Sequence, residues 1–166
     1  LNLLRKKKIL KNQAFKINIK KNIPHGSGLG GGSSNAANLL NYLNSKMKLK
    51  LDRNKMKKLA SKIGFDVPIN LEKKNTLLTG KNDRFLRLDQ KLRLNLLIVY
   101  PNIVCSTKKI YKYNQNISRL KPKVSFNIKN NKKLINFLKE QHNDLERTVV
   151  KIYPKIKKVI YFIQSQ

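Results

Sequence analysis

Residues 21–43 read KNIPHGSGLGGGSSNAANLLNYL and form the most informative stretch of the chain. Five of the seven residues at positions 26–32 are glycines, and two serines and an apolar-periodic run follow them. We expect Ser33 or Ser34 to cap a helix that runs to about Lys46. Glycines ahead of a helix N-terminus let backbone N–H groups approach a phosphate without a Cβ in the way. The stretch therefore predicts a phosphate-binding loop.

One interpretation of this loop is a dinucleotide-binding fingerprint. Gly26, Gly28 and Gly31 fit G-x-G-x-x-G, and the alternating pattern of residues 14–20 predicts a strand before them. Asp52 follows at about the distance of a ribose-binding acid. However, the predicted strand is amphipathic and rich in lysine, whereas a parallel sheet needs a buried apolar strand. The dinucleotide interpretation is therefore disfavoured.

A second interpretation is the Walker A loop. Gly26 and Gly31 have its G-x-x-x-x-G spacing, but Gly32 stands where the loop requires lysine. Without that lysine the charge of the phosphates is not met, so we exclude this interpretation. A purely structural alternative is a tight strand-to-helix turn with Ser33 as N-cap, but such a turn needs fewer glycines.

The fourth interpretation rests on a resemblance to the superfamily of galactokinase, homoserine kinase, mevalonate kinase and phosphomevalonate kinase. Residues 24–34 fit its pattern, roughly P-x-G-x-G-L-G-G-G-S-S, without a gap. The extension Asn35-Ala36-Ala37 is similar to one group within it, the kinases of 4-diphosphocytidyl-2-C-methyl-D-erythritol in the non-mevalonate isoprenoid pathway. The resemblance implies the following ATP-binding residues, of which the first is a weak match to an adenine-pocket lysine: Lys21, Pro24, His25, Gly26, Ser27, Gly28, Leu29, Gly30, Gly31, Gly32, Ser33 and Ser34.

A second motif lies downstream, where residues 63–68 read IGFDVP. The resembled kinases have G-x-D-V-P at this point. The resemblance implies that Asp66 is the catalytic base, which accepts a proton from a hydroxyl as that oxygen attacks the γ-phosphoryl group. The structural alternative is that Asp66 caps a helix before Pro68. The position of the motif after the glycine loop favours the catalytic interpretation.

Residues 101–112, PNIVCSTKKIYK, resemble the segment that flanks the cytidine in the same kinases. The resemblance implies that Tyr111 stacks on cytosine and that Thr107 hydrogen-bonds the ribose region. The structural alternative is that Thr107 caps a short helix and that Tyr111 belongs to the core. The sequence leaves both interpretations open.

Two motifs expected from the resemblance are absent. The family opens with an A-K-I-N-L strand whose lysine assists phosphoryl transfer. Lys16 lies in a similar FKINI stretch, but directly before the glycine loop, so we assign it to the pre-loop strand. A late glycine motif resembling S-G-S-G-A is not reached before Gln166, and the chain begins with Leu1 rather than Met. We therefore expect an internal piece of a longer kinase that is inactive by itself.

The spacing of apolar residues predicts an α+β chain. The resemblance implies a two-lobed small-molecule kinase fold that is incomplete at both ends, with residues 1–90 as a partial N-terminal ATP-binding lobe and residues 91–166 as a partial C-terminal lobe. The expected elements are strands at 14–20 and 92–100, a hairpin over 76–88 that turns near 80–83, and helices at 1–10, from Ser33 or Ser34 to 46, at 52–63 with Gly64 as C-cap, at 108–113 capped by Ser106 or Thr107, at 134–138, and at 145–163 with a break near Pro154.

The composition has a globular balance, with 40% hydrophobic and 28% charged residues. The formal net charge is +30, from 38 Lys and Arg against 8 Asp and Glu, which on its own favours a nucleic-acid-binding protein. However, lysine is spread along the whole chain, and Lys, Asn and Ile, which are all abundant, have AT-rich codons. Coding bias therefore explains the charge better than nucleic-acid binding does.

A single cysteine, Cys105, excludes an internal disulfide and favours a cytoplasmic protein. No apolar run approaches the roughly 20 residues of a membrane span, and we identify no signal peptide. The resemblance implies ATP and Mg²⁺ as cofactors and ATP with 4-diphosphocytidyl-2-C-methyl-D-erythritol as partners, with neither nucleic acid nor membrane. We identify no metal ligands. Another alcohol kinase of the superfamily, of homoserine or mevalonate type, is the main alternative.

Overall fold

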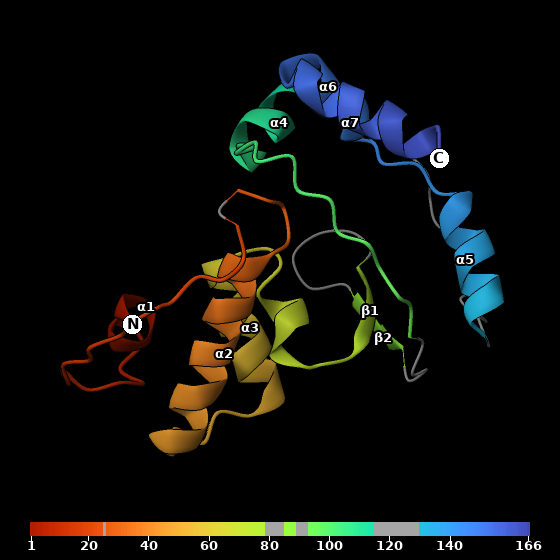
Figure 1. Cartoon of the computed structure of the whole chain (residues 1–166). Helices are drawn as coiled ribbons and strands as arrows, with labels where there is room; N and C mark the ends of the chain where they lie inside the picture. The colour runs from red at the N-terminus through yellow and green to blue at the C-terminus, as the bar shows by residue number, and fades with distance from the viewer. Residues whose placement is uncertain (25, 79–84, 89–92, 115–129) are drawn as a thin grey trace. The chain divides into compact units, whose positions relative to one another are not determined.

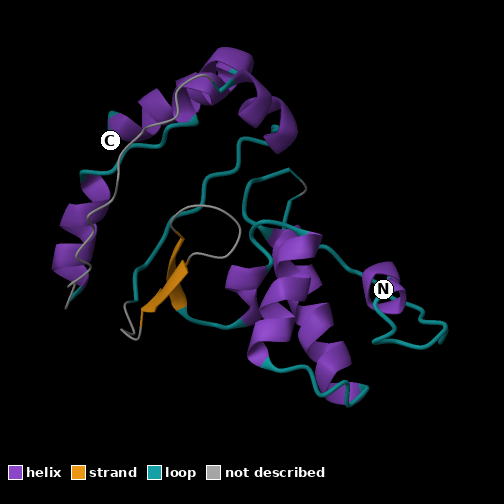
Figure 2. Ribbon diagram, turned by 180° about the vertical axis from the view of Figure 1, so that it is seen from behind, coloured by secondary structure: helices purple, strands orange, loops and turns teal. Residues whose placement is uncertain are grey.

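The computed structural model describes residues 1–24, 26–78, 85–88, 93–114 and 130–166, and Figures 1 and 2 show it from opposite sides. Its elements form two compact units, one of Leu1–Asn22 with Gly30–Asp89 and the other of Ile23–Leu29 with Gln90–Gln166. Along the chain these elements are α1 (Asn2–Lys6), α2 (Gly31–Lys46), α3 (Arg53–Ile63), the 3₁₀ helix η1 (Pro68–Leu71), β1 (Asn75–Leu78), β2 (Phe85–Leu88), α4 (Thr107–Tyr113), α5 (Asn131–Lys139), α6 (Glu146–Ile152) and α7 (Pro154–Gln164).

The core of the first unit lies between α2 and α3, which pack against each other and against η1 (Figure 1). Apolar residues recur every three or four positions on both helices, so each helix has one apolar face. Burying a leucine side chain stabilises a fold by about 1.5–3 kcal/mol, so this shared face holds the unit together. The buried residues of the core are Leu4, Leu10, Ala37, Leu40, Leu43, Met56, Leu59, Ala60 and Val67.

Both predicted ends of α3 are confirmed. Asp52 is the N-cap, and its Oδ1 accepts a hydrogen bond of 2.8 Å from the Lys55 N–H. This bond is the main cause that lowers the pKa of the Asp52 carboxyl. Gly64 is the C-cap, and its N–H donates to the Ala60 carbonyl. A short polar side chain before the helix and a glycine after it therefore fixed both boundaries.

Helix α1 is shorter than the predicted helix at residues 1–10. It ends at Lys6 because Lys8 adopts a left-handed backbone with φ of 55°. The N–H groups of Lys8 and Ile9 then bond back to the carbonyls of Arg5 (2.8 Å) and Leu4 (3.0 Å). This pair of bonds satisfies the last carbonyls of the helix and turns the chain toward the core.

Strands β1 and β2 form the predicted hairpin, which is antiparallel and coloured orange in Figure 2. Its register places Thr76 opposite Arg87 and Leu78 opposite Phe85. The turn predicted at residues 80–83 lies outside the described residues. Alternation between two strands joined by a short connection was enough to identify this element.

Two other predicted strands are wrong. Residues 14–20 and 93–100 contain no strand, and Leu92 lies outside the described residues. Neither an alternating pattern nor an apolar run supplies the neighbouring backbone to which a strand must hydrogen-bond. Within the described ranges the sheet consists of β1 and β2 alone. Leu97 is accordingly 89% exposed in spite of its apolar side chain.

In the second unit, α6 packs against α4 and α7. Ile110 of α4 is buried, and the buried Thr148 hydroxyl of α6 donates to the Asn114 Oδ1 (3.0 Å). The predicted break near Pro154 is confirmed, because this proline is the first residue of α7. The predicted helix at 134–138 lies within α5. Among the described residues, no helix has both the length and the apolar character that crossing a membrane requires.

Candidate functional site

Helix α2 begins without a side-chain cap. Gly30 is its N-cap with φ of 68°, and the Ser34 N–H donates to the Gly30 carbonyl (3.0 Å). The prediction that Ser33 or Ser34 caps this helix is wrong, because the left-handed backbone of the glycine starts the helix before the serines. The first N–H groups of a helix lack intrahelical partners, and the first turn of α2 has no acidic residue. This helix end therefore offers donors and partial positive charge to an anion.

A cleft of about 610 Å³ lies beside the first turns of α2. It brings together Lys21 and Gly32, two of the residues predicted to bind ATP. Small-molecule pockets commonly measure about 300–1,000 Å³, and the mixture of apolar walls, amides and lysines suits a heterocycle that carries an anion. The lining residues are Ile17, Asn18, Ile19, Lys20, Lys21, Gly32, Asn35, Ala36, Asn38 and Leu39.

The segment Ile23–Leu29 belongs to the second unit. Gly26 and Gly28 have φ of 69° and 77°. The Cys105 N–H donates to the Gly26 carbonyl (3.2 Å), and a Cβ added to Gly26 would lie 2.6 Å from Val104 Cγ1. Position 26 therefore requires glycine both for its backbone conformation and for its close contact with the 104–105 segment. Burial raises the pKa of the Cys105 thiol.

The other residues predicted to bind ATP lie along the same stretch. Ser34 is held by Asn38, whose Nδ2 donates to the Ser34 carbonyl (2.9 Å) and approaches its Oγ (3.4 Å). His25 lies outside the described residues. Through its contact with residues 104–105, Gly26 lies against the segment that leads to Thr107. Among the remaining members, Pro24, Leu29, Gly30 and Gly32 are exposed, and Ser27, Gly31 and Ser33 are half-buried.

Asp66 lies on a tight turn between α3 and η1. The Val67 N–H donates to the Gly64 carbonyl (3.2 Å), and Asn70 Nδ2 donates to the Asp66 carbonyl (2.7 Å). Val67 and Pro68 are buried, whereas Asp66 is exposed. The capping alternative is wrong, because Val67 is the N-cap of η1 and no side chain caps that helix. The turn thus presents an exposed carboxylate on a backbone anchored in the core.

The side chains of α4 divide into structural and exposed ones. Ser106 is the N-cap, and its Oγ accepts from the Lys109 N–H (3.3 Å). Ile110 makes the buried contact of this helix. Thr107 is exposed, and Tyr111 is 67% exposed. The alternatives that Thr107 caps the helix and that Tyr111 belongs to the core are therefore wrong, and both side chains are accessible to a ligand.

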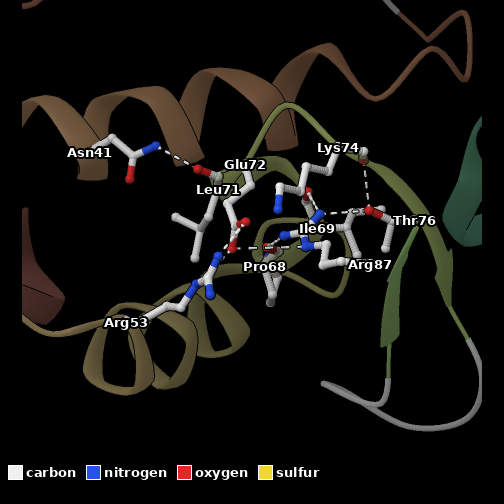
Figure 3. Close-up of polar contacts among 9 residues, drawn as sticks. All are labelled: Asn41, Arg53, Pro68, Ile69, Leu71, Glu72, Lys74, Thr76 and Arg87. Carbon is white, nitrogen blue, oxygen red and sulfur yellow. Dashed lines mark hydrogen bonds and ion pairs between the residues drawn. The ribbon is translucent and has the colours of Figure 1, made fainter. Parts of the chain in front are cut away.

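Arg87 of β2 joins the hairpin to the backbone that follows Asp66 (Figure 3). Its Nη1 donates to the Ile69 carbonyl (2.7 Å) and to Thr76 Oγ1 (2.6 Å), and its Nη2 donates to the Pro68 carbonyl (3.1 Å). Burial of the guanidinium lowers the pKa of Arg87. The η1 helix is therefore held on one side by the core and on the other by a nearly buried cation.

Glu72 connects this arginine to α3. Its Oε1 lies 2.9 Å from Arg53 Nε and 3.9 Å from Arg87 Nε. The hydrogen bond from Arg53 is the main cause that lowers the pKa of the Glu72 carboxyl. Sequence patterns did not identify this network. The available signal was Arg87, a cation in the otherwise apolar strand FLRL, opposite a threonine.

Comparison with known proteins identifies the relatives of this chain. Residues 1–72, which include the glycine segment and Asp66, match the family described as GHMP kinases N terminal domain. Over 166 residues the chain is 36% identical to the 4-diphosphocytidyl-2-C-methyl-D-erythritol kinase of Pelagibacter ubique (strain HTCC1062). The aligned region covers 99% of this chain and 57% of the relative. The first 72 residues of the chain are therefore similar to the N-terminal domain of the GHMP kinases. The resemblance inferred from its motifs is confirmed.

Further kinases of the same name are similar to this chain. That of Buchnera aphidicola subsp. Schizaphis graminum (strain Sg) is 40% identical over 149 residues, or 87% of this chain and 47% of the relative. That of Persephonella marina (strain DSM 14350 / EX-H1) is 45% identical over 93 residues, or 56% of this chain and 34% of the relative. The chain spans about half the length of the curated relatives it matches.

The Mg²⁺ that a GHMP kinase implies was tested against the side chains present. Within the part of the chain that the structure describes, no group of three or more His, Cys, Asp or Glu side chains could hold a metal ion. Mg²⁺ usually keeps several waters and binds through one or two carboxylates together with substrate phosphates. The described residues therefore do not form a metal site by themselves, and we assign no protein ligand to Mg²⁺.

Proposed function

We propose that the protein carrying this chain transfers the γ-phosphoryl group of ATP to the 2-hydroxyl of 4-diphosphocytidyl-2-C-methyl-D-erythritol, a step of the non-mevalonate isoprenoid pathway. The observation that carries the proposal is the uncapped N-terminus of α2 beside a cleft that contains Lys21 and Gly32. A helix end with free donors and an adjoining pocket meets the two requirements of a nucleoside triphosphate. Similarity to a kinase of that name over 99% of the chain supports the choice of substrate.

In this proposal, the glycine segment and α2 bind the nucleotide. The N–H groups at the start of α2 donate to phosphate oxygens, and the helix dipole adds to the attraction. Gly32, which is exposed at this end, leaves room for a phosphate. Lys21, in the wall of the cleft, is assigned to the adenosine end of ATP. Mg²⁺ would enter with the phosphates and neutralise part of their charge.

Asp66 is assigned the role of general base. Its carboxylate accepts the proton of the 2-hydroxyl while the hydroxyl oxygen bonds to the γ-phosphorus, and the bond from that phosphorus to ADP breaks. The Asp66 side chain is exposed and forms no ion pair with any described residue, so its carboxylate oxygens remain accessible to a substrate hydroxyl. The anchored turn supports the role because a base must keep a fixed position relative to the reacting hydroxyl.

The cytidine end of the second substrate, away from its reacting hydroxyl, is assigned to α4. Tyr111 offers an exposed ring on which cytosine can stack, and Thr107 offers an exposed hydroxyl for the ribose region. We further propose the two-lobed arrangement of this kinase type, with residues 1–90 in the ATP-binding lobe and residues 91–166 in the other lobe. The bond between Cys105 and Gly26 supports a functional link between the α4 segment and the glycine segment.

The substrate assignment is tested by incubating the full-length protein with ATP, Mg²⁺ and one alcohol at a time, and following ADP release together with the ³¹P spectrum of the product. We expect phosphorylation of 4-diphosphocytidyl-2-C-methyl-D-erythritol and none of homoserine or mevalonate. Turnover of homoserine or mevalonate alone would move the protein to another kinase type. Binding of RNA with a steep salt dependence and no kinase activity would favour the nucleic-acid interpretation instead.

The role of Asp66 is tested by Asp66→Asn in the same protein. The substitution keeps the size of the side chain and removes the base, so we expect kcat to fall about 10²–10⁴-fold while the KM for ATP changes little. Asp52→Asn is the matched control, because asparagine caps a helix about as well as aspartate and should leave turnover near that of the wild type. Near-normal turnover of the Asp66→Asn variant would refute the assignment.

A further inference from the structure

The β1–β2 hairpin has no role in the proposed reaction, yet it sends one side chain to the catalytic turn. Arg87 donates to the carbonyls of Pro68 and Ile69, the second and third residues after Asp66 (Figure 3). We propose that Arg87 is a positioning residue, which holds the turn so that the Asp66 carboxylate stays in place for proton transfer. This inference rests on the proposed function, because it gives Arg87 its role through Asp66.

The contacts of Arg87 are those of a fixed side chain rather than a mobile surface cation. Its side chain is only 14% exposed, and it makes three hydrogen bonds of 2.6–3.1 Å. The guanidinium also lies over the Phe85 ring, 4.5 Å from its centroid. A planar fork with several donors can bind two successive carbonyls at once, which a lysine ammonium on a flexible stem does not reproduce.

Two neighbouring residues, Thr76 and Glu72, also hold Arg87. Thr76, its directly opposed partner on β1, accepts from Nη1 and donates its own hydroxyl to the Lys74 carbonyl (2.8 Å). Glu72 lies 3.9 Å from its Nε and is held by Arg53 of α3. Arg87 thus joins η1 to the hairpin and is linked to α3 through Glu72, so its orientation does not depend on a single bond.

The turn itself has two other restraints, which explains why Arg87 affects position more than folding. Val67 is 2% exposed in the core, and Asn70 Nδ2 bonds to the Asp66 carbonyl (2.7 Å). These contacts hold the two ends of residues 66–70, and Arg87 adds two donors to the carbonyls of Pro68 and Ile69 between them. Without the guanidinium those carbonyls lose the donors that tie η1 to the hairpin, and η1 can shift. A displacement of about 1 Å at a catalytic group can cost about 100-fold in rate.

The test is Arg87→Met in the full-length protein, with Arg53→Met as the matched control. Methionine keeps an unbranched stem and removes every donor. Arg53 shares Glu72 with Arg87 but has no hydrogen bond to the turn carbonyls. With rates expressed per folded active site, we expect Arg87→Met to lower kcat about 10- to 100-fold with little change in the KM for ATP, and Arg53→Met to leave kcat near the wild type.

A double substitution separates positioning from general loss of structure. If Arg87 acts through Asp66, adding Arg87→Met to Asp66→Asn lowers the residual rate no further, because the group to be positioned is already absent. A drop in the double variant equal to the product of the single drops would overturn the proposal. So would a kcat per folded site for Arg87→Met that equals the wild-type value.

Two additional measurements keep the inference independent of the kinase assignment. Backbone amide exchange over residues 67–71 should become faster in Arg87→Met and stay unchanged in Arg53→Met, whichever substrate the protein uses. Unchanged exchange in both variants would overturn the clamp itself, whereas absence of wild-type kinase activity would overturn only the proposed function. If Arg87→Met does not fold, Thr76→Val removes one acceptor of the guanidinium and should give a smaller loss of kcat, and no loss would refute the proposal.

Discussion

Gly26→Ala tests the contact between Gly26 and the segment of Val104 and Cys105 that precedes α4. The added Cβ would lie 2.6 Å from Val104 Cγ1, well inside van der Waals contact. Overpacking of this kind costs about 1–3 kcal/mol. The backbone of Gly26, with φ of 69°, adds about 1–2 kcal/mol for any residue that has a Cβ. We therefore expect Gly26→Ala to lower the free energy of unfolding by about 2–5 kcal/mol.

Gly28 provides the matched control for this prediction. Its φ of 77° is similar, but no described atom lies within 4 Å of an added Cβ. Gly28→Ala should therefore cost only the backbone component, about 1–2 kcal/mol. Val104→Ala removes the methyl group that clashes, and because Val104 is 59% exposed it should cost little by itself. In the double variant, Val104→Ala should restore Gly26→Ala to the stability of Gly28→Ala.

The assay is urea denaturation of the full-length variants, followed by circular dichroism at 222 nm and compared at constant m-value. The quantity of interest is the difference between Gly26→Ala and Gly28→Ala, with and without Val104. Equal losses for the two glycine variants would refute the close contact. A Val104→Ala substitution that fails to recover the extra loss would show that the strain comes from elsewhere.

Two further predictions concern the acceptor segment and the Glu72 network. Tyr111→Ala should raise the KM for 4-diphosphocytidyl-2-C-methyl-D-erythritol about tenfold and leave the KM for ATP unchanged, since stacking on an aromatic ring contributes about 1–3 kcal/mol, and Tyr111→Phe should bind nearly as well as the wild type. Equal effects on both KM values would contradict this role. Because hydrogen bonding lowers the folded-state pKa of Glu72, its stabilising contribution is complete above the unfolded-state pKa and is lost as the pH falls through the folded-state value. The difference in urea midpoint between wild type and Glu72→Gln should therefore be constant near pH 7 and shrink as the pH falls below about 4. A difference that is the same at pH 7 and at pH 3 would refute it.

Local signals in the sequence predicted most of the helices. Asp52 before an apolar-periodic run and Gly64 after it defined α3, because capping chemistry is written in the side chains themselves. The start of α2 was predicted a few residues too late, because no side chain caps this helix. Gly30 begins that helix through its positive φ, which is a property of the backbone and not of a side chain. The two serines nearby are good capping residues, so the sequence pattern favoured them instead.

Long-range contacts could not be predicted in the same way. The alternation at residues 14–20 and the apolar run at residues 93–100 are typical of strands, but a strand exists only where another backbone accepts its hydrogen bonds. Arg87 was missed because its role depends on carbonyls 18 and 19 positions earlier, which only the folded hairpin brings within reach. The residues of the candidate site were predicted because their motifs are continuous in the sequence. The Arg87 contacts that hold the site were not predicted, because they join residues far apart in the sequence.

The structure narrows the interpretation of Asp66 and Thr107 by assigning their structural roles to other residues. Each had a plausible role as a helix cap, and each cap is taken by a neighbour: Val67 begins η1, and Ser106 caps α4. A polar side chain that is exposed, lies next to an anchored backbone and has no part in capping contributes little to folding. Such a residue is the kind that a fold can devote to binding or catalysis. The general-base hypothesis for Asp66 therefore no longer competes with a capping role, and the comparison of Asp66→Asn with Asp52→Asn measures it directly.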